Sequence, residues 1–175
     1  MRYVALLRGI NVGGKSMMKM DDLKALFAEL GFKNVKSYIN SGNLAFDTKK
    51  TAEAKLVDKI EDAVESTFGR RVHIMVREQK DLERILKNNP FEGEFESHKH
   101  MHVLFLKEEL PSEKLSALQG AAHEGERYAA IGRELYAHLP HGVADSLLSK
   151  GFFEKKPVVH YTGRNWRTVE KLSGL

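Results

Sequence analysis

A glycine-rich segment near the start of the sequence has the residues from which a phosphate site could be built. Residues 9–16 read GINVGGKS and satisfy the pattern G-x-x-x-x-G-K-[ST]. In a loop of this kind, glycines let backbone N–H groups wrap a phosphate, and the lysine adds a positive charge. The segment follows a predicted apolar strand, as such loops do. It predicts a loop that binds an anion through Lys15, and the alternative is a tight strand-to-helix connection without a ligand.

The surrounding sequence argues against nucleotide hydrolysis at this loop. P-loop enzymes place an aspartate that helps to hold Mg²⁺ after a second apolar strand. Here the most apolar later strand, residues 101–106, is followed by Lys107, and the other candidate, residues 44–47, lies in an expected hairpin. A P-loop NTPase or a small transferase therefore ranks below a simple binding site. No residue receives a catalytic role, because no general base is placed by the sequence.

A second group of polar residues, TGRNWR at 162–167, lies near the other end of the sequence. Arg164 and Arg167 are three residues apart, so on a helix they share a face. With Trp166 they could form a basic rim beside an aromatic surface suited to a nucleobase. The alternative is that Trp166 anchors the last helix in the core, as large aromatic side chains usually do.

Histidines at 98, 100 and 102 would share one face if they lay on a strand, and imidazole pairs can chelate a metal. No further ligand is placed near them, so we assign no metal and no cofactor. The sequence contains no cysteine, which excludes disulfides, zinc–thiolate sites and a thiol nucleophile.

Hydrophobic periodicity predicts the elements that must position these residues. Residues 1–78 read in the order strand, helix, strand, strand, helix, strand, and the same order recurs over residues 101–161. The expected strands are 2–8, 35–39, 44–46, 72–76, 101–106, 128–131, 135–139 and 158–161, and the expected helices are 23–30, 51–69, 80–88, 112–121, 143–152 and a last one from Thr162. The two halves share no residue-level similarity. The sequence therefore predicts an α+β fold: two ferredoxin-like βαββαβ halves in tandem, residues 1–78 and 101–175, joined by a linking helix and acidic loop at 79–100, with a C-terminal helix in the second half.

The basic residues are unevenly distributed along the sequence. Residues 1–50 carry nine Lys and Arg against four Asp and Glu, and residues 151–175 carry five against two, whereas the middle is acidic. If these regions meet, they make a positive face that favours phosphates or nucleic acid. No apolar stretch approaches the roughly 18 residues of a membrane span, and the first apolar run is short for a signal peptide. We expect a cytoplasmic protein without a membrane partner.

Three segments together carry a family resemblance. They are LLRGINVGGK at 6–15, YINSGN at 38–43 and RNWRTVEKL at 164–172. In this order and spacing the chain resembles the DUF1697 family, uncharacterised bacterial proteins, over essentially its whole length. The resemblance implies an α+β fold and a cytoplasmic bacterial protein, and it implies no reaction, substrate or cofactor.

We expect these three segments to converge on an anionic small ligand, either a phosphate-bearing metabolite or a nucleotide. The candidate ligand-binding residues are Arg8, Asn11, Gly13, Gly14, Lys15, Lys19, Ser41, Asn43, Arg164, Asn165 and Trp166. The alternative is an RNA- or DNA-binding protein, since ferredoxin-like sheets also bind RNA. Against this alternative, Tyr38, Phe46 and Tyr128 do not form a clear pair for base stacking. The sequence leaves the oligomeric state open.

Overall fold

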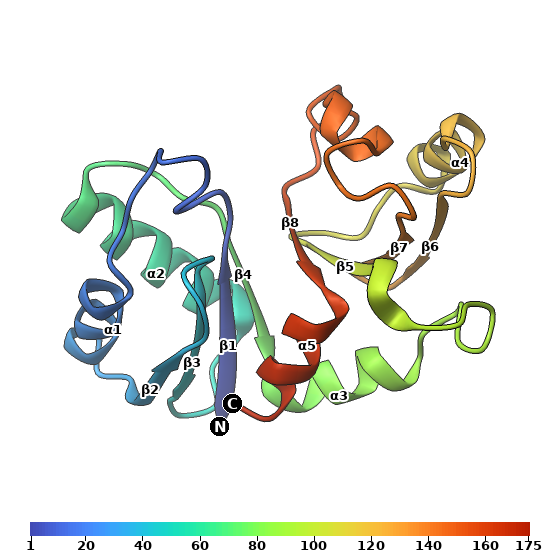
Figure 1. The fold of residues 1–175 in the computed structure, drawn as a ribbon. Helices are drawn as coiled ribbons and strands as arrows, with labels where there is room; N and C mark the ends of the chain where they lie inside the picture. The colour runs from blue at the N-terminus through green and yellow to red at the C-terminus, as the bar shows by residue number, and fades with distance from the viewer. The chain divides into compact units, whose positions relative to one another are not determined.

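The chain folds as two units, each built on one four-stranded antiparallel sheet, in the computed structural model that describes residues 1–175 (Figure 1). Unit 1 comprises Met1–Arg84 together with Glu170–Leu175, and unit 2 comprises Ile85–Val169. The boundaries between the units fall inside two helices, α3 (Gln79–Lys87) and α5 (Trp166–Ser173). Each of these helices directly follows the fourth strand of a sheet.

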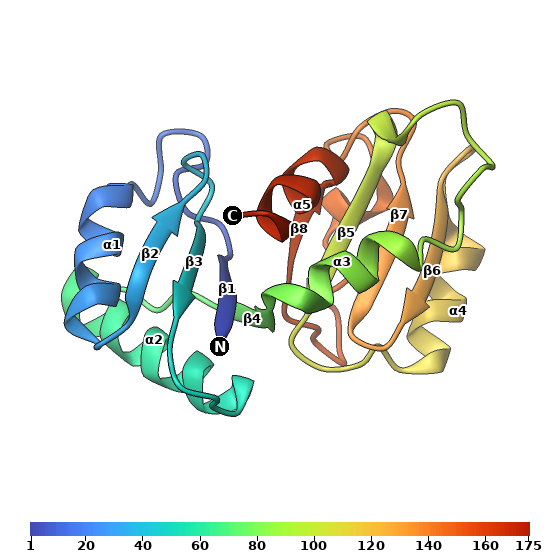
Figure 2. The same ribbon diagram turned by 90° about the horizontal axis from the view of Figure 1, so that it is seen from below.

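Unit 1 has the predicted βαββαβ order. Its elements are β1 (Arg2–Leu7), α1 (Met20–Glu29), β2 (Lys33–Ser37), β3 (Asn43–Asp47), α2 (Glu53–Phe68) and β4 (Ile74–Glu78). The sheet order is β2-β3-β1-β4 with all neighbours antiparallel, which is the ferredoxin-like arrangement. Figures 1 and 2 show α1 and α2 on the same side of this sheet.

The helices of unit 1 follow from their apolar spacing. In α2, Leu56, Ile60 and Val64 recur every fourth residue and are buried against the sheet. The helix ends at Gly69, whose φ of +73° is the left-handed conformation that glycine adopts without strain. A cluster of phenylalanines joins α1 to the sheet, with the ring centroids of Phe32 and Phe46 4.3 Å apart.

Unit 2 repeats this sheet. Its elements are the 3₁₀ helix η1 (His98–His100), β5 (Met101–Leu106), α4 (Ser112–Ala121), β6 (Arg127–Ile131), β7 (Glu134–His138), the 3₁₀ helix η2 (Leu147–Lys150) and β8 (Tyr161–Asn165). The order β6-β7-β5-β8 matches that of unit 1, strand for strand. The predicted fold of two tandem ferredoxin-like halves is confirmed.

The two sheets also agree residue by residue in their pairing. Val4 of β1 lies opposite Arg77 of β4, and Val103 of β5 lies opposite Arg164 of β8. Both arginines are buried, and each stands two residues before the helix that follows its strand. The two halves therefore repeat the same strand pairing, residue for residue, although their sequences show no similarity.

Three predicted elements of unit 2 are wrong. Residues 143–152 form only the short η2 instead of an α-helix. The Ser146 hydroxyl donates to the Val143 oxygen over 2.6 Å, which favours a local turn, and Gly151 adopts a left-handed φ of +75°. The last strand is Tyr161–Asn165 instead of 158–161. The last helix begins at Trp166 instead of Thr162, because Thr162 pairs with Phe105 in the sheet.

No helix in the structure combines the length and the apolar character needed to cross a membrane.

Candidate functional site

The glycine-rich loop between β1 and α1 contains a small hairpin. Val12 and Lys15 pair across it, and the Lys15 amide donates to the Val12 oxygen over 3.0 Å. The two residues between them, Gly13 and Gly14, have φ of +59° and +72°. Positive φ at both central residues is the requirement of a tight two-residue hairpin turn. The predicted glycines therefore form a turn, and the Lys15 side chain stands exposed beside it.

This loop differs from the phosphate-wrapping loop that its sequence pattern also describes. In that loop the helix follows the glycines and lysine directly, so its first N–H groups face the phosphate. Here α1 begins at Met20, four residues after Ser16, and the Asn11 amide donates to the Ser16 oxygen over 3.2 Å. An anion at this loop would meet the Lys15 side chain instead of a ring of amides.

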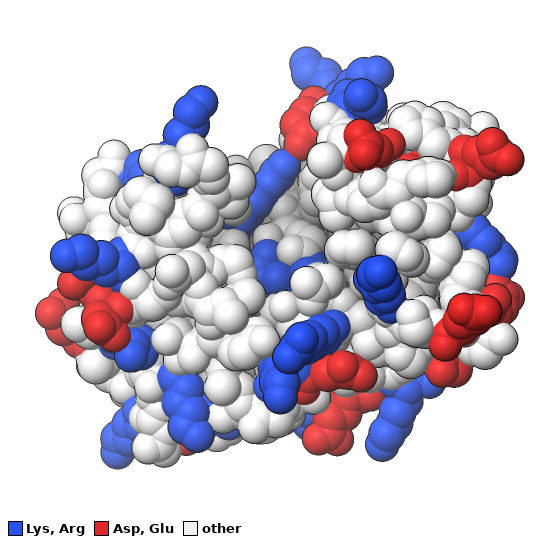
Figure 3. All heavy atoms as spheres, viewed as in Figure 1, with Lys and Arg blue, Asp and Glu red and all other residues white.

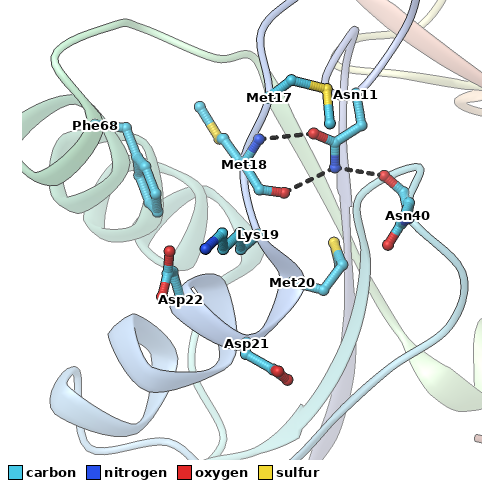
Figure 4. Close-up of a pocket in the computed structure, with 9 residues that line it drawn as sticks. All are labelled: Asn11, Met17, Met18, Lys19, Met20, Asp21, Asp22, Asn40 and Phe68. Atoms are coloured by element: carbon cyan, nitrogen blue, oxygen red, sulfur yellow. Dashed lines mark hydrogen bonds between the residues drawn. The ribbon is translucent and has the colours of Figure 1, made fainter. Parts of the chain in front are cut away.

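Asn11 fastens the loop to its surroundings (Figure 4). Its Nδ2 donates to the Met18 oxygen over 2.8 Å and to the Asn40 oxygen over 2.7 Å, and its Oδ1 accepts from the Met18 amide over 2.7 Å. The predicted ligand-binding residue Asn11 thus uses both side-chain donor hydrogens and its acceptor within the protein. Its structural effect is to fix the β1–α1 loop against the turn that joins β2 to β3.

That turn, residues 39–42, packs closely on β1. The Leu7 amide donates to the Gly42 oxygen over 2.9 Å, and a Cβ added to Gly42 would lie 2.8 Å from the Leu7 Cβ. Asn43 is fully buried, and its Nδ2 donates to the Tyr38 oxygen and to Ser41 Oγ. The predicted residues Ser41 and Asn43 therefore hold the turn together.

The loop, the turn and the start of α1 line an open pocket of about 660 Å³. Its lining residues come from four segments of unit 1, as Figure 4 shows: Asn11, Met17, Met18, Lys19, Met20, Asp21, Asp22, Asn40 and Phe68. Of the predicted residues, Asn11 and Lys19 line this pocket. The three methionines and Phe68 are lining residues that the sequence motifs do not indicate. The methionine cluster at 17–20 was the available signal.

The charges around the pocket have both signs. Lys19 is the N-cap residue of α1, and its side chain makes no capping hydrogen bond to the first turn of the helix. The helix carries Asp21 and Asp22 in its first turn, where carboxylates suit the helix dipole. Lys24 binds Asp21 with 2.8 Å between Nζ and Oδ1, and this hydrogen bond lowers the pKa of Asp21. The site can therefore offer both a cation and a carboxylate acceptor to a ligand.

The predicted residues Arg164, Asn165 and Trp166 belong to unit 2, whereas the other candidates belong to unit 1. Arg164 lies in β8, where its Nη1 donates to Thr162 Oγ1 over 2.6 Å, and burial lowers its pKa to about 10. The Asn165 Oδ1 caps α5 by accepting from the Thr168 amide over 2.9 Å. Arg164 therefore does not stand on an exposed helical rim.

Trp166 is buried, with 4% of its surface exposed. Its ring stacks on His98 with 4.7 Å between centroids, and His98 Nε2 lies 2.9 Å from the Glu92 carboxylate. These contacts agree with the alternative prediction that Trp166 anchors the last helix in the protein core. The histidines at 98 and 100 lie in η1 and His102 lies in β5, and the structure has no group of three or more His, Cys, Asp or Glu side chains arranged to hold a metal ion.

Basic side chains are dispersed on the visible surface of each unit. Figure 3 shows Lys and Arg interspersed with Asp and Glu and separated by wide uncharged areas. Arg2 shows why a large number of Lys and Arg residues in a segment does not by itself make a positively charged surface. Its Nη1 pairs with Asp47 Oδ1 at 2.8 Å, and its Nη2 donates to the Leu175 oxygen at 3.1 Å.

The two sheets, with their shared strand order, define the class: an α+β protein of two tandem ferredoxin-like halves. The model of the DUF1697 family, described as a protein of unknown function, matches residues 1–136, and the chain belongs to this family. Among solved structures the chain is similar to the conserved bacterial protein SP0830 from Streptococcus pneumoniae. That likeness has a TM-score of 0.75 and 28% sequence identity, and it covers 99% of this chain and 97% of the other. No curated protein matches the chain.

Proposed function

We propose that the protein binds a small molecule with an apolar body and an anionic group, such as a nucleotide, in the pocket beside the glycine-rich loop. The observation that carries this proposal is the pocket itself. Its volume of about 660 Å³ falls in the range of roughly 300–1,000 Å³ that is usual for ligand sites.

The apolar part of the ligand would contact methionines and one aromatic ring. Met17, Met18 and Met20 line one part of the pocket, and Phe68 comes from the end of α2 (Figure 4). Methionine side chains are flexible and polarizable, and they make favourable contacts with aromatic rings. Met17 is 69% exposed, so its apolar surface is available to a ligand without rearrangement of the core.

The polar part of the ligand would contact charges of both signs. Lys19 lines the pocket, so a phosphate there has a cation to meet, and Lys15 stands exposed on the hairpin of the same loop. The Asp22 carboxylate would repel a second negative group but accept hydrogen bonds from hydroxyl or amino groups. A nucleotide combines a ring, hydroxyl groups and a phosphate, and so matches this set.

Thermal-shift screening against nucleotides, sugar phosphates and coenzymes, followed by calorimetric titration, tests the proposal. Lys19→Ala should weaken binding of the hit at least tenfold, because a hydrogen bond to a charged group contributes roughly 1.5–3 kcal/mol. Lys36→Ala is the matched control, since Lys36 is an exposed residue of β2 that does not line the pocket. Equal binding by the Lys19 and Lys36 variants, or a screen without hits, would count against the proposal.

Nucleic-acid binding is the competing outcome of the same experiments. RNA-binding sheets of this topology stack bases on exposed strand aromatics. In this protein Phe46 is fully buried among the rings of unit 1, and Tyr128 is buried with its hydroxyl bonded to Glu126. Binding of mixed RNA with a steep dependence on salt, in place of a small-molecule hit, would therefore require a different surface and would replace our proposal.

A further inference from the structure

The second half lacks the helix that covers part of the sheet in the first half. In unit 1 the segment between the third and fourth strands is α2, whose apolar stripe is buried against the sheet. In unit 2 the corresponding segment, residues 139–160, has only the short η2 as a regular element. A short irregular segment cannot supply the continuous apolar stripe that a helix of 16 residues provides.

The register shows where side-chain volume moves from the edge strand to its neighbour. In unit 1, Val76 of β4 lies opposite Ala5 of β1, and both are buried. The equivalent pair in unit 2 is Gly163 of β8 opposite Leu104 of β5. Glycine therefore replaces the valine on the edge strand, while leucine replaces the alanine on its neighbour, so Gly163 leaves an exposed gap beside the Leu104 side chain.

A pocket of about 160 Å³ occupies this place. Its wall is mostly apolar, and the two lining side chains that carry a polar group are His102 and Tyr161. The lining residues are His102, Leu104, Leu139, Val143, Leu148, Tyr161 and Gly163. Val143 is 46% exposed, so it carries the apolar surface out to solvent. A cavity of about 150 Å³ with apolar walls is large enough to hold one benzene ring.

His102 gives this pocket a defined hydrogen-bonding character. Its Nδ1 lies 3.2 Å from the His100 oxygen, and a carbonyl oxygen only accepts, so Nδ1 carries the hydrogen. Burial lowers the pKa of His102, and the opposing effect of its hydrogen bond to the His100 oxygen is smaller. The ring is therefore neutral at neutral pH, and Nε2 is its acceptor.

We propose that this pocket binds a small aromatic molecule with one hydrogen-bond donor, of the phenol class. The volume fits one ring, the walls fit its faces, and Nε2 of His102 would accept from the hydroxyl. A charged ligand is disfavoured, because the lining contains no Lys, Arg, Asp or Glu to pair with it. This site lies in unit 2 and does not depend on the function proposed for the pocket of unit 1.

Titration of the isotopically labelled full chain with phenol, followed by two-dimensional NMR, tests the proposal, with toluene as the matched probe that lacks a donor. Phenol should give saturable shifts at the pocket residues. Gly163→Val should abolish them by filling the cavity. This substitution can be accommodated, because Gly163 does not need a positive φ and a Cβ there meets Leu104 Cγ at an ordinary 3.8 Å. Gly163→Ala is the milder filling variant and should weaken binding.

Two further variants separate the pocket from general effects. Gly120→Ala, in α4 with open space around it, is the control and should bind phenol like the wild type. His102→Phe keeps a ring but removes the acceptor, so it should weaken phenol binding about three- to tenfold while leaving toluene unchanged. Absence of saturable shifts, shifts that persist in Gly163→Val, or toluene binding as tight as that of phenol would each overturn the proposal.

Discussion

Replacing Gly42 with alanine should destabilise unit 1 more than the same replacement at any other glycine of the unit. Gly42 has a φ of +85°, and holding an L-residue in that region costs about 1–2 kcal/mol. The added Cβ would also lie 2.8 Å from Leu7 Cβ and 3.0 Å from two atoms of the Ile10 side chain. Both neighbours are buried, and a Cβ cannot rotate away without moving β1. Such overlap in a packed core adds about 1–3 kcal/mol, so we expect a total loss of about 2–5 kcal/mol.

Gly14→Ala is the matched control for this substitution. Gly14 also has a positive φ, +72°, but a Cβ there would meet no atom within 4 Å. Its replacement should therefore carry only the conformational cost of about 1–2 kcal/mol. The difference between the two variants measures the close approach of the turn to β1.

The assay is urea unfolding followed through backbone NMR signals of unit 1, because two units need not unfold in one transition. If Gly42→Ala and Gly14→Ala lose equal stability, the turn can move off β1 without cost. The close packing of Gly42 on Leu7 would then not be a constraint, and our account of this turn would be refuted.

Three further substitutions follow from the contacts of single residues. Ile39→Asn should raise the free energy of unfolding by about 1 kcal/mol, because Ile39 is an exposed, branched residue at φ +50° and asparagine tolerates that region better; a loss in urea unfolding would contradict this. Asn165→Ala should lower stability by about 1 kcal/mol through loss of the α5 cap, and unchanged stability would exclude the capping role. Burial lowers the pKa of His138, so the unfolded chain binds more protons than the folded one just below pH 6.5. Stability should therefore fall as the pH drops from 7 towards 5.5, and His138→Phe, which keeps the ring stacked on Phe95, should show a smaller fall.

The fold was predictable because its elements carry strong local signals. The apolar run of β1, the four-residue spacing in α2 and the stop at Gly69 each indicate one structure. The segment 143–152 was misread because Leu147 and Leu148 lie among residues that suit a helix, while the local bonds of Ser146 and the turn at Gly151 favour an irregular path. Hydrophobic spacing does not record such competition between side chain and backbone.

The candidate site was predictable in place but not in form. The pattern of residues 9–16 located a loop beside the pocket of unit 1, yet it could not tell a two-residue hairpin from a phosphate-wrapping loop. Both need glycine at positive φ, so the residue types agree with either. The burial of Arg164 was equally hidden, because it depends on a strand register that pairs it with Val103.

The division of α5 between the two units has a consequence for biosynthesis. Residues Glu170–Leu175 belong to unit 1, but all of unit 2 is translated before them. Until they emerge, unit 1 lacks the buried Leu172 and the hydrogen bond from Gln79 Nε2 to its oxygen, 3.1 Å long. At about 5–20 residues per second, unit 1 stays incomplete on the ribosome for several seconds after its own sheet has been made. Nascent chains stalled within unit 2 should therefore be open to proteases in the part of the protein that was synthesised first.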